Sequence, residues 1–387
     1  MERPPALAII ANSYTPYRAH LHRRIAREIP EYRLLSVFTH ETSDSPWTFT
    51  APPEINPISF GHGESIENQS RLTQQSKEWR RGGRIIQFLR EHHVRAIVMM
   101  GYNDLGRVRI LRWCHRHGVR RLLFGDSNIR GDRASGVKKL VKQSLLHRVL
   151  AWCDGVLVCG SLGKEYFEEY GADSDRIFYF PYEPDYEQIQ GITPGEMRAV
   201  AEQFHISSDH RYLIYSGRLA QAKRVDLLID AFARIAHQRP LWNLIIVGDG
   251  PLRESLQPRV PVDLRSRVIW TGFLGDQRII SALYRLGDVL VLPSDYEPWG
   301  LVINEATAAG MAIVASDVVG AAAELVRDGI NGRIFSHGSM DGLSKALLAM
   351  TDAQQIERYK MASGEVLADW RRRADPVVGL RKALEIG

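Results

Sequence analysis

Short apolar runs alternate with amphipathic stretches of helical length throughout the second half of this chain, and this alternation restricts the fold more than any other feature. Strands that alternate with helices build a parallel sheet covered by helices on both faces. The runs are apolar almost throughout, as strands buried on both faces must be. The predicted strands are residues 213–215, 244–247, 268–270, 289–292 and 313–315, and the predicted helices are 224–237, 276–286, 301–309 and 321–326, with another starting at Leu252.

The first half of the chain shows the same alternation with longer interruptions. A stretch rich in Pro, Ser and Thr is expected to be an irregular loop, and a later stretch rich in Pro and Gly is expected to be an inter-domain linker. The predicted strands are residues 7–11, 96–100, 121–124 and 155–159, the predicted helix is 19–28, the loop is 42–63, and the linker is 185–196.

A chain of 387 residues is long enough for two such domains. We predict an N-terminal domain over residues 1–188 and a C-terminal domain over 189–369. A helical segment over 370–387, broken near Asp375-Pro376, is expected to pack back on the first domain. Ligands bind at the carboxyl ends of the strands in doubly wound sheets, so the site is expected there, in the cleft that two facing domains form.

Three cysteines, Cys114, Cys153 and Cys159, form no Cys-x-x-Cys pair. Their odd number and spacing argue against a disulfide framework or a structural zinc site and favour a reducing compartment. The apolar run at residues 6–11 is shorter than the core of a signal peptide. No stretch reaches the roughly 18 apolar residues of a membrane span. We therefore expect a cytoplasmic protein.

Positive charge is concentrated in residues 71–148, which hold 19 Lys/Arg against 5 Asp/Glu. Such a segment attracts anionic lipid, nucleic acid or an acidic glycan, and the plain alternative is a solvated, Arg-rich helical surface. Residues 137–152 combine lysines with aliphatic residues at helical spacing. This pattern predicts either a helix that docks peripherally on the inner face of an anionic membrane or a helix packed in the core. Nucleic acid is disfavoured as a partner, because aromatic residues are not interleaved with the basic ones.

Two carboxylates, Glu297 and Glu305, flank the predicted start of a helix that follows a buried strand. The first amides of a helix lack intrahelical acceptors and carry partial positive charge, so they suit a diphosphate or a sugar hydroxyl. Each carboxylate can accept two hydroxyl hydrogen bonds, and both a sugar and a ribose offer vicinal pairs. The structural alternative is that Glu297 caps the helix and Glu305 makes a surface ion pair.

A second pattern, Ser216-Gly217-Arg218-Leu219 followed by Lys223, comes directly after the strand at 213–215. Gly217 suits a close approach of backbone, Arg218 can grip phosphate oxygens with two hydrogen bonds, and Lys223 adds a mobile charge. Two cations can neutralise a departing diphosphate without a metal. These residues could instead solvate a helix start, although cations are mildly unfavourable there.

A third pattern, Gly248-Asp249-Gly250-Pro251, predicts a sharp turn between a strand and a helix. Proline is well placed at the first position of a helix. Asp249 could simply cap that helix.

Taken in order, these motifs resemble the family 4 retaining glycosyltransferases, over roughly residues 210–350. The motifs that carry the resemblance are Ser216-Gly217-Arg218-Leu219 with Lys223, Gly248-Asp249-Gly250-Pro251, Thr271-Gly272-Phe273, Pro293-Ser294, the pair Glu297 and Glu305 in the Glu-x7-Glu arrangement, and Asp328-Gly329-Ile330-Asn331-Gly332.

The resemblance implies an α/β protein of the GT-B type, in which two Rossmann-like doubly wound domains face a central cleft. The N-terminal domain would bind the acceptor and the C-terminal domain the nucleotide sugar. Arg218 and Lys223 would hold the diphosphate, Glu297 would contact the donor hexose and Glu305 the ribose. The other donor-site positions that the resemblance implies are Gly217, Asp249, Gly250, Phe273, Gly300, Leu301 and Val302.

The first half of the chain departs from the family pattern. Many members carry a Gly-Gly pair after the first strand, whereas this chain carries a Thr-Pro-Tyr-Arg element like that of one branch of the family. The usual histidine-containing site is not evident, and Asp126, after the strand at 121–124, takes its place in our interpretation. The residues expected on the acceptor side are Tyr14, Tyr17, Arg18 and Asp126.

The implied reaction moves a hexose-type sugar from a nucleotide diphosphate sugar to a glycan, lipid-linked or small-molecule acceptor by front-face substitution, with retention of configuration. A UDP-sugar is favoured over GDP-mannose. No cofactor and no metal are expected, because closely spaced histidines such as His115 and His117 lie on different faces of a helix and cannot chelate together. The alternative is a non-catalytic relative that binds a nucleotide sugar or an anionic surface.

Overall fold

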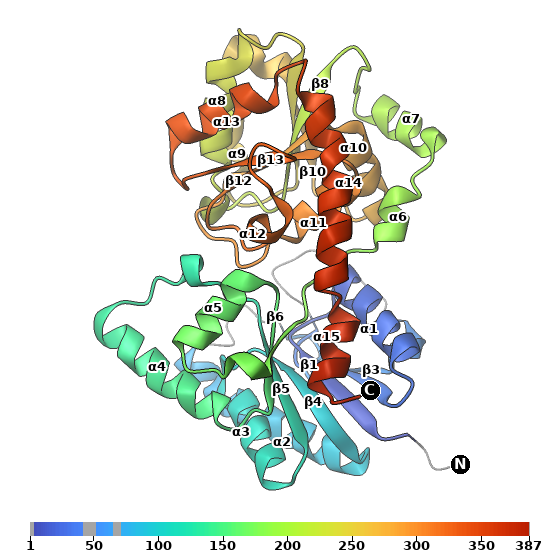
Figure 1. Cartoon of the computed structure of the whole chain (residues 1–387), viewed down its shortest axis with the longest axis vertical. Helices are drawn as coiled ribbons and strands as arrows, with labels where there is room; N and C mark the ends of the chain where they lie inside the picture. Colours follow the sequence, from blue (N-terminus) through green and yellow to red (C-terminus); the bar gives the residue numbers. More distant parts are fainter. Residues whose placement is uncertain (1–3, 42–51, 65–70, 387) are drawn as a thin grey trace. The chain divides into compact units, whose positions relative to one another are not determined.

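The computed structural model describes residues 4–41, 52–64 and 71–386, and the chain divides into two compact units, each built on its own sheet (Figure 1). Unit 1 comprises Met1–Tyr182 and Ala374–Gly387, and unit 2 comprises Glu183–Arg373. These divisions lie a few residues from the expected domain boundaries, which were 188/189 and 369/370.

The sheet of unit 1 has seven parallel strands in the order β3-β2-β1-β4-β5-β6-β7. Every residue of β1 is buried, and so is nearly every residue of β4, the strand beside it. The strands are β1 Ala6–Ala11, β2 Arg33–Phe38, β3 Pro57–Ser59, β4 Val94–Met100, β5 Arg120–Gly125, β6 Gly155–Val158 and β7 Ile177–Tyr179.

The helices of unit 1 connect these strands, and the last one comes from the C-terminal segment of the chain. The α-helices are α1 Pro16–Glu28, α2 Gln75–Glu91, α3 Leu105–Arg116, α4 Gly136–Leu150, α5 Ser161–Glu169 and α15 Pro376–Ala383. The short 3-10 helices are η1 Pro53–Ile55, η3 Leu72–Gln74, η4 Ile129–Gly131 and η5 Ser174–Arg176.

Three strands of unit 1, namely β2, β3 and β7, were not predicted from the sequence. In β2 the apolar run is broken by Ser36, which is nevertheless buried, because its hydroxyl lies 2.7 Å from Nδ1 of the buried His22. The short edge strand β3 lies within the stretch 42–63 that was predicted as an irregular loop, so this prediction is wrong at Pro57–Ser59. Residues 42–51 of that stretch lie outside the described residues.

The sheet of unit 2 has six parallel strands in the order β10-β9-β8-β11-β12-β13. The strands are β8 Arg211–Ser216, β9 Trp242–Val247, β10 Val268–Gly272, β11 Val289–Leu292, β12 Ala312–Ser316 and β13 Gly332–Phe335. The α-helices are α6 Tyr186–Gln190, α7 Pro194–Gln203, α8 Val225–Ala236, α9 Arg253–Leu256, α10 Gln277–Leu286, α11 Leu301–Ala308, α12 Ala322–Leu325, α13 Met340–Met350 and α14 Ile356–Arg373, and the 3-10 helices are η6 Gln221–Lys223, η7 Gln257–Arg259 and η8 Val262–Arg267.

The stretch 185–196, predicted as a linker, is largely helical and belongs to unit 2, so the prediction is wrong. Asp185 caps α6 by accepting a hydrogen bond from the amide of Gln188, and Thr193 and Glu196 form a reciprocal capping box at the start of α7. The Pro and Gly residues that suggested a linker therefore mark helix ends.

The two sheets confirm the predicted fold class, which is a pair of Rossmann-like domains with parallel strands and connecting helices. The predicted break near Asp375-Pro376 is also confirmed, because Asp375 caps α15 after α14 has ended. None of the helices in the described part of the chain is both long and apolar enough to cross a membrane.

Candidate active site

The strand order of the second sheet reverses between β8 and β11, because the chain builds β9 and β10 on one side of β8 and β12 and β13 on the far side of β11. All strands are parallel, so their carboxyl ends lie at one edge of the sheet. A reversal of this kind separates the loops that follow the two central strands and leaves room for a ligand between them. The loops after β8 and β11 are those that carry the basic and acidic motifs.

The loops after β8, β9 and β10 are joined by backbone hydrogen bonds. The amide of Leu219 donates to the carbonyl of Asp249 at 2.9 Å, and the amide of Gly248 donates to the carbonyl of Gly272 at 2.9 Å. Gly248 has a φ of 129°, and a Cβ atom on it would lie 2.1 Å from the carbonyl oxygen of Gly217. Glycine is therefore required at Gly248, and three motifs distant in sequence form one surface.

An ion pair joins the loop after β8 to the loop after β11. Lys223, the last residue of η6, contacts Glu297 through its ammonium group, and their side chains are 26% and 13% exposed. A second pair supports the first, since Arg224 and Asp295 lie 2.9 Å apart. Lys223 and Glu297 were predicted as site residues from two separate motifs. In the structure they are in direct contact, and both remain accessible to solvent.

Gly300 begins α11 in the left-handed region, with a φ of 90°. A Cβ atom there would lie 3.1 Å from Cγ of Glu297 and 3.0 Å from Cγ1 of Val319, so the site favours glycine. The N-cap residue is thus a glycine, which has no side chain to cap the helix, and no acidic residue lies in the first turn of α11. Glu297 packs beside the helix start, near the partly exposed Leu301 and Val302.

Glu305, in the second turn of α11, is held by Tyr284 of α10. The Tyr284 hydroxyl lies 3.0 Å from Oε2 of Glu305 and 2.7 Å from Oγ of Ser216. A hydroxyl has one proton, so Tyr284 donates to the carboxylate and accepts from Ser216. Burial raises the pKa of Glu305 to about 7, although the Tyr284 hydrogen bond opposes this shift. The alternative predicted from the sequence was that Glu305 makes a surface ion pair. In the structure its carboxyl is instead partly buried and hydrogen-bonded.

Three further predicted donor-site residues lie at the same edge with different surroundings. Asp249 is exposed and accepts a hydrogen bond from the amide of Gly250 at 2.7 Å, while its other oxygen lies 2.8 Å from Arg253. The hydrogen bond from Gly250 is the largest cause that lowers the pKa of Asp249. Arg218 is exposed, and its carbonyl accepts from the Tyr215 hydroxyl at 2.9 Å. The Phe273 side chain is 39% exposed.

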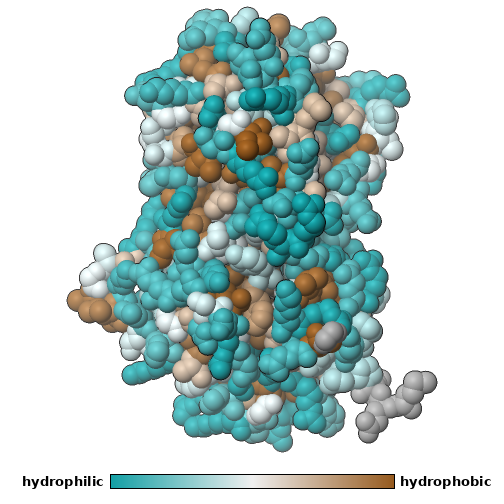
Figure 2. Space-filling view, in the orientation of Figure 1, coloured by the Kyte–Doolittle hydropathy of each residue, from teal (hydrophilic) through white to brown (hydrophobic). Residues whose placement is uncertain are grey.

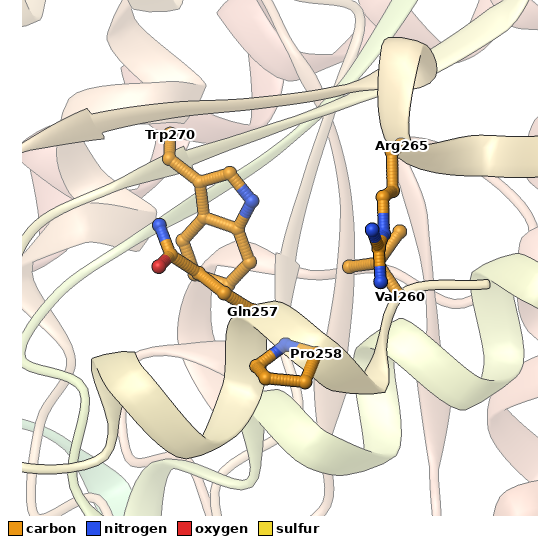
Figure 3. Close-up of a pocket in the computed structure, with 5 residues that line it drawn as sticks. All are labelled: Gln257, Pro258, Val260, Arg265 and Trp270. Atoms are coloured by element: carbon orange, nitrogen blue, oxygen red, sulfur yellow. The ribbon is translucent and has the colours of Figure 1, made fainter. Parts of the chain in front are cut away.

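A hollow of about 400 Å³ is lined by the second of these ion pairs, Arg224–Asp295, and not by Lys223 or Glu297. Its lining residues are Gln221, Arg224, Asp226, Leu252, Ser255, Leu256, Arg259 and Asp295. A separate pocket of about 390 Å³ is lined by Trp270 of the edge strand β10 and by Gln257, Pro258, Val260 and Arg265, and Figure 3 shows Arg265 next to Val260, apart from the Trp270 ring. None of the predicted site residues lines either cavity, so neither cavity by itself marks the predicted site.

Unit 1 brings three of the four predicted acceptor-side residues together at the carboxyl edge of its own sheet. Arg18 is buried, and its guanidinium donates to the carbonyl of Ser13 at 2.6 Å. Burial alone would lower the pKa of Arg18, but nearby Tyr17, Tyr182 and Asp126 reverse this and raise it. Tyr17 also packs edge-on against Tyr182, with ring centroids 5.1 Å apart.

Tyr14 lies apart from that cluster. Its ring packs edge-on against Phe38 at the end of β2, with centroids 5.3 Å apart. Burial raises its pKa, while Arg23 lowers it and Glu54 raises it. Its neighbours therefore differ from those of Tyr17 and Arg18.

The sequence analysis missed a buried polar network at the centre of the same edge. Arg107 pairs with Asp104 and contacts the side-chain oxygen of Asn12, and its Nε donates to the carbonyl of Met100 at 3.1 Å. Arg107 and Asp104 are each 1% exposed in their side chains. No local signal marks Arg107, because its helix, α3, contains several other arginines that read equally well as surface residues.

The fold of the chain is similar to that of solved proteins. The Anabaena protein HepE, solved in complex with UDP and glucose, aligns with a TM-score of 0.71 at 18% identity over 98% of each chain. This likeness shows the fold, which is the GT-B fold of glycosyltransferases.

The sequence similarity to a known family lies within unit 2. Residues 197–364 match the family described as glycosyl transferases group 1. Alpha-D-kanosaminyltransferase of Streptomyces kanamyceticus is 32% identical over 177 residues, which are 46% of this chain and 45% of that protein. A GDP-mannose-dependent phosphatidylinositol dimannoside mannosyltransferase of Mycobacterium tuberculosis is 28% identical over 214 residues, 53% of each chain. The chain thus matches about half the length of these relatives, and the matches support a transferase.

Proposed function

We propose that this protein is a retaining glycosyltransferase of the family 4 type, which moves a hexose-type sugar from a nucleotide diphosphate sugar without a metal. One observation carries the proposal: Lys223 and Glu297 meet at the switch point of the second sheet, beside the start of α11, whose N-cap residue is Gly300. Cations, a carboxylate and free helix amides in one place are what a pyrophosphate-linked sugar requires.

In this proposal the ion pair opens when the donor binds. Lys223 and Arg218 turn to the diphosphate, and the carboxylate of Glu297 accepts hydrogen bonds from the hexose hydroxyls. The amides of residues 300–302 face the sugar and phosphate. Glu305 accepts from the ribose hydroxyls, and the Phe273 loop lies near the base. Gly217, Asp249 and Gly250 shape the backbone around the phosphates.

The proposed reaction is a front-face substitution. The bond between the sugar C1 and the diphosphate oxygen breaks, and both electrons leave with the diphosphate, whose charge Arg218, Lys223 and the helix amides stabilise. The acceptor oxygen forms its bond to C1 from the same face. Its proton passes to a phosphate oxygen of the departing nucleotide. Configuration is retained, and no protein nucleophile is needed, unlike in a retaining glycosidase.

We favour a UDP-sugar as donor over GDP-mannose. HepE was solved with UDP and glucose, whereas the mycobacterial relative uses GDP-mannose, so both bases are represented among similar proteins. The acceptor in our proposal is a glycan, a lipid-linked sugar or a small molecule, received by unit 1. A cytoplasmic setting is supported by the three cysteines, which are buried free thiols.

Nucleotide release tests the proposal directly. The protein is incubated with UDP-sugars, GDP-mannose and ADP-glucose, with and without EDTA, and released nucleotide is measured. We expect turnover with a UDP-sugar that EDTA leaves intact, and proton NMR of the product should show the anomeric configuration of the donor. An inverted anomer would exclude front-face substitution, and complete loss of activity with EDTA would exclude a metal-independent reaction.

The same panel separates the enzyme from its alternative, a non-catalytic relative. Such a protein would gain thermal stability from a nucleotide sugar and release no nucleotide with any acceptor. The presence of Arg218, Lys223, Glu297 and Glu305 at one edge favours the enzyme.

A further inference from the structure

The helix α4 of unit 1 turns its apolar face away from the protein. Of its 15 residues, Leu146 and Val149 are fully buried. Val137, Leu140, Val141 and Leu145 are 75%, 66%, 64% and 47% exposed. These four share one side of the helix, since they are spaced by three, four and eight residues, whereas the buried Leu146 lies on the opposite side and the buried Val149 one turn after Leu145, at the margin of the exposed face. The alternative of a core-packed helix is therefore wrong for these four positions.

Polar contacts hold the inward side of α4 in place. Lys142 lies 2.8 Å from Asp132 and stacks over the rings of Tyr166 and Tyr170, at 4.9 and 5.0 Å from their centroids. Lys139 pairs with Glu169 of α5. A helix fastened in this way cannot easily rotate to bury its outer face. Figure 2 shows hydrophobic surface protruding at the free end of α4, at the edge of the view.

The charge around this apolar face is positive. Residues 130–148 contain six Lys or Arg and one acidic residue, Asp132. Lys138 and Arg148 lie on the exposed part of α4. Aliphatic residues that protrude among cations match a bilayer whose headgroups are anionic, because the side chains enter the acyl boundary while the cations meet the headgroups.

We propose that the outer face of α4, made by Val137, Leu140, Val141 and Leu145 with its flanking cations, docks on the surface of an anionic lipid bilayer. A second copy of the chain fits less well. Stable dimers bury about 800 Å² per partner, well above what four aliphatic side chains supply, and like charges would face each other across such a contact. The proposal concerns binding alone and does not depend on the proposed catalysis.

Vesicle binding tests the docking surface. The full chain is sedimented with vesicles of equal parts phosphatidylglycerol and phosphatidylcholine, and with vesicles of phosphatidylcholine alone. We expect binding to the anionic vesicles that weakens as salt is raised, and at least about tenfold weaker binding to the neutral ones. The double variant L140D/V141D should lose at least about tenfold in affinity, because it removes apolar contact and adds negative charge.

A matched control removes exposed aliphatic residues elsewhere. The double variant L241D/V262D changes two side chains of unit 2 that are 59% and 76% exposed, with the same change in net charge, and should bind within about twofold of wild type. K138Q should weaken binding about fivefold and reduce the salt dependence. Thermal unfolding of all variants should match wild type, since the substituted side chains are exposed.

Three results would overturn the proposal. They are the absence of wild-type binding to anionic vesicles at low salt, equal losses in L140D/V141D and L241D/V262D, and equal binding to neutral and anionic vesicles. Light scattering measures whether the chain forms a dimer. A dimer that L140D/V141D dissociates, without vesicle binding, would assign the face to a second copy instead.

Discussion

The two sheets carry an ion pair at the same topological position, and the two pairs differ in how completely the protein satisfies them. In unit 1 the pair Arg107–Asp104 lies beside β1 and β4, where the strand order reverses, and its side chains are 1% exposed. In unit 2 the pair Lys223–Glu297 lies beside β8 and β11, and its side chains are 26% and 13% exposed.

The difference lies in the neighbours of each pair. Arg107 also meets the side chains of Asn12 and Thr39 and the carbonyl of Met100, so its hydrogen-bonding capacity is taken up within the protein. Lys223 has Glu297 and solvent. A charge whose partners are all internal supports the fold, whereas one that keeps contact with solvent can exchange its partner for a ligand.

The largest effect is expected from D104N in unit 1. This isosteric change leaves the buried guanidinium of Arg107 without its counter-charge, and the loss of one partner of a buried pair costs about 3–5 kcal/mol of the free energy of unfolding. Urea unfolding followed by circular dichroism measures it. The control is D154N, which breaks the Arg121–Asp154 pair, whose Asp154 side chain is 34% exposed. D154N should lower the free energy of unfolding by less than D104N does. Equal losses would show that burial does not distinguish the two ion pairs.

The next effect is expected from K223M in unit 2. Loss of one cation at the leaving diphosphate should lower nucleotide release about 100- to 1,000-fold, while the free energy of unfolding stays within about 1 kcal/mol of wild type. The control is R234M, which breaks the exposed Arg234–Asp341 pair of the same unit and should keep full activity. A K223M protein that is active but as unstable as D104N would show that both pairs serve the fold.

A smaller effect, with a pH dependence, is expected from E305Q. The pKa of Glu305 is about 7 in the folded protein against an ordinary value of 4.5. Between these values the unfolded chain releases the proton and the folded chain keeps it. The free energy of unfolding therefore falls as pH rises through this window, by up to about 3 kcal/mol, and it is unaffected by this group below about pH 4.5.

E305Q should flatten that dependence, as urea unfolding between pH 5 and 8 would reveal. Y284F should shift the window upward, because the Tyr284 hydroxyl lowers the pKa of Glu305. Donor affinity should change in the opposite direction to stability, since an ionised carboxylate accepts ribose hydroxyls better and predominates above pH 7. A wild-type protein whose stability is constant over this range would exclude the shifted pKa.

The sequence predicts much of unit 2 because its motifs are local. Gly217 and Gly248 each serve a turn directly after a strand and Gly300 precedes a helix, and the types of residue needed there can be recognised within a few positions. The contact between Lys223 and Glu297 could not be recognised, because it depends on which strands become neighbours. The same holds for Tyr284, whose hydroxyl reaches Glu305 from another helix.

The sequence predicts less of unit 1 because its edge is built from dispersed partners. Arg107 meets Asn12 and Thr39, which follow β1 and β2, and the carbonyl of Met100 at the end of β4, and none of the short segments around them has a distinctive spacing. The strand β2 was missed for a related reason. Its buried Ser36 is satisfied by His22 of α1, and only the packed structure reveals that partner.

The smallest effect is expected from D249A. This variant tests whether Asp249 supports the fold, as Asp104 does, or binds the donor, as we propose for Lys223. Its carboxylate accepts from the amide of Gly250 and pairs with Arg253, so it resembles Asp104 in having internal partners, although it is exposed. If it only shapes the turn, D249A should cost about 1 kcal/mol of unfolding free energy, as the loss of a single hydrogen bond does, and leave the KM for the donor within about twofold. A KM raised about tenfold with unchanged stability would instead mean that Asp249 gives up its partners to the donor, as we propose for Lys223. Solvent contact, rather than the number of internal partners, would then decide which charges at this edge serve the ligand.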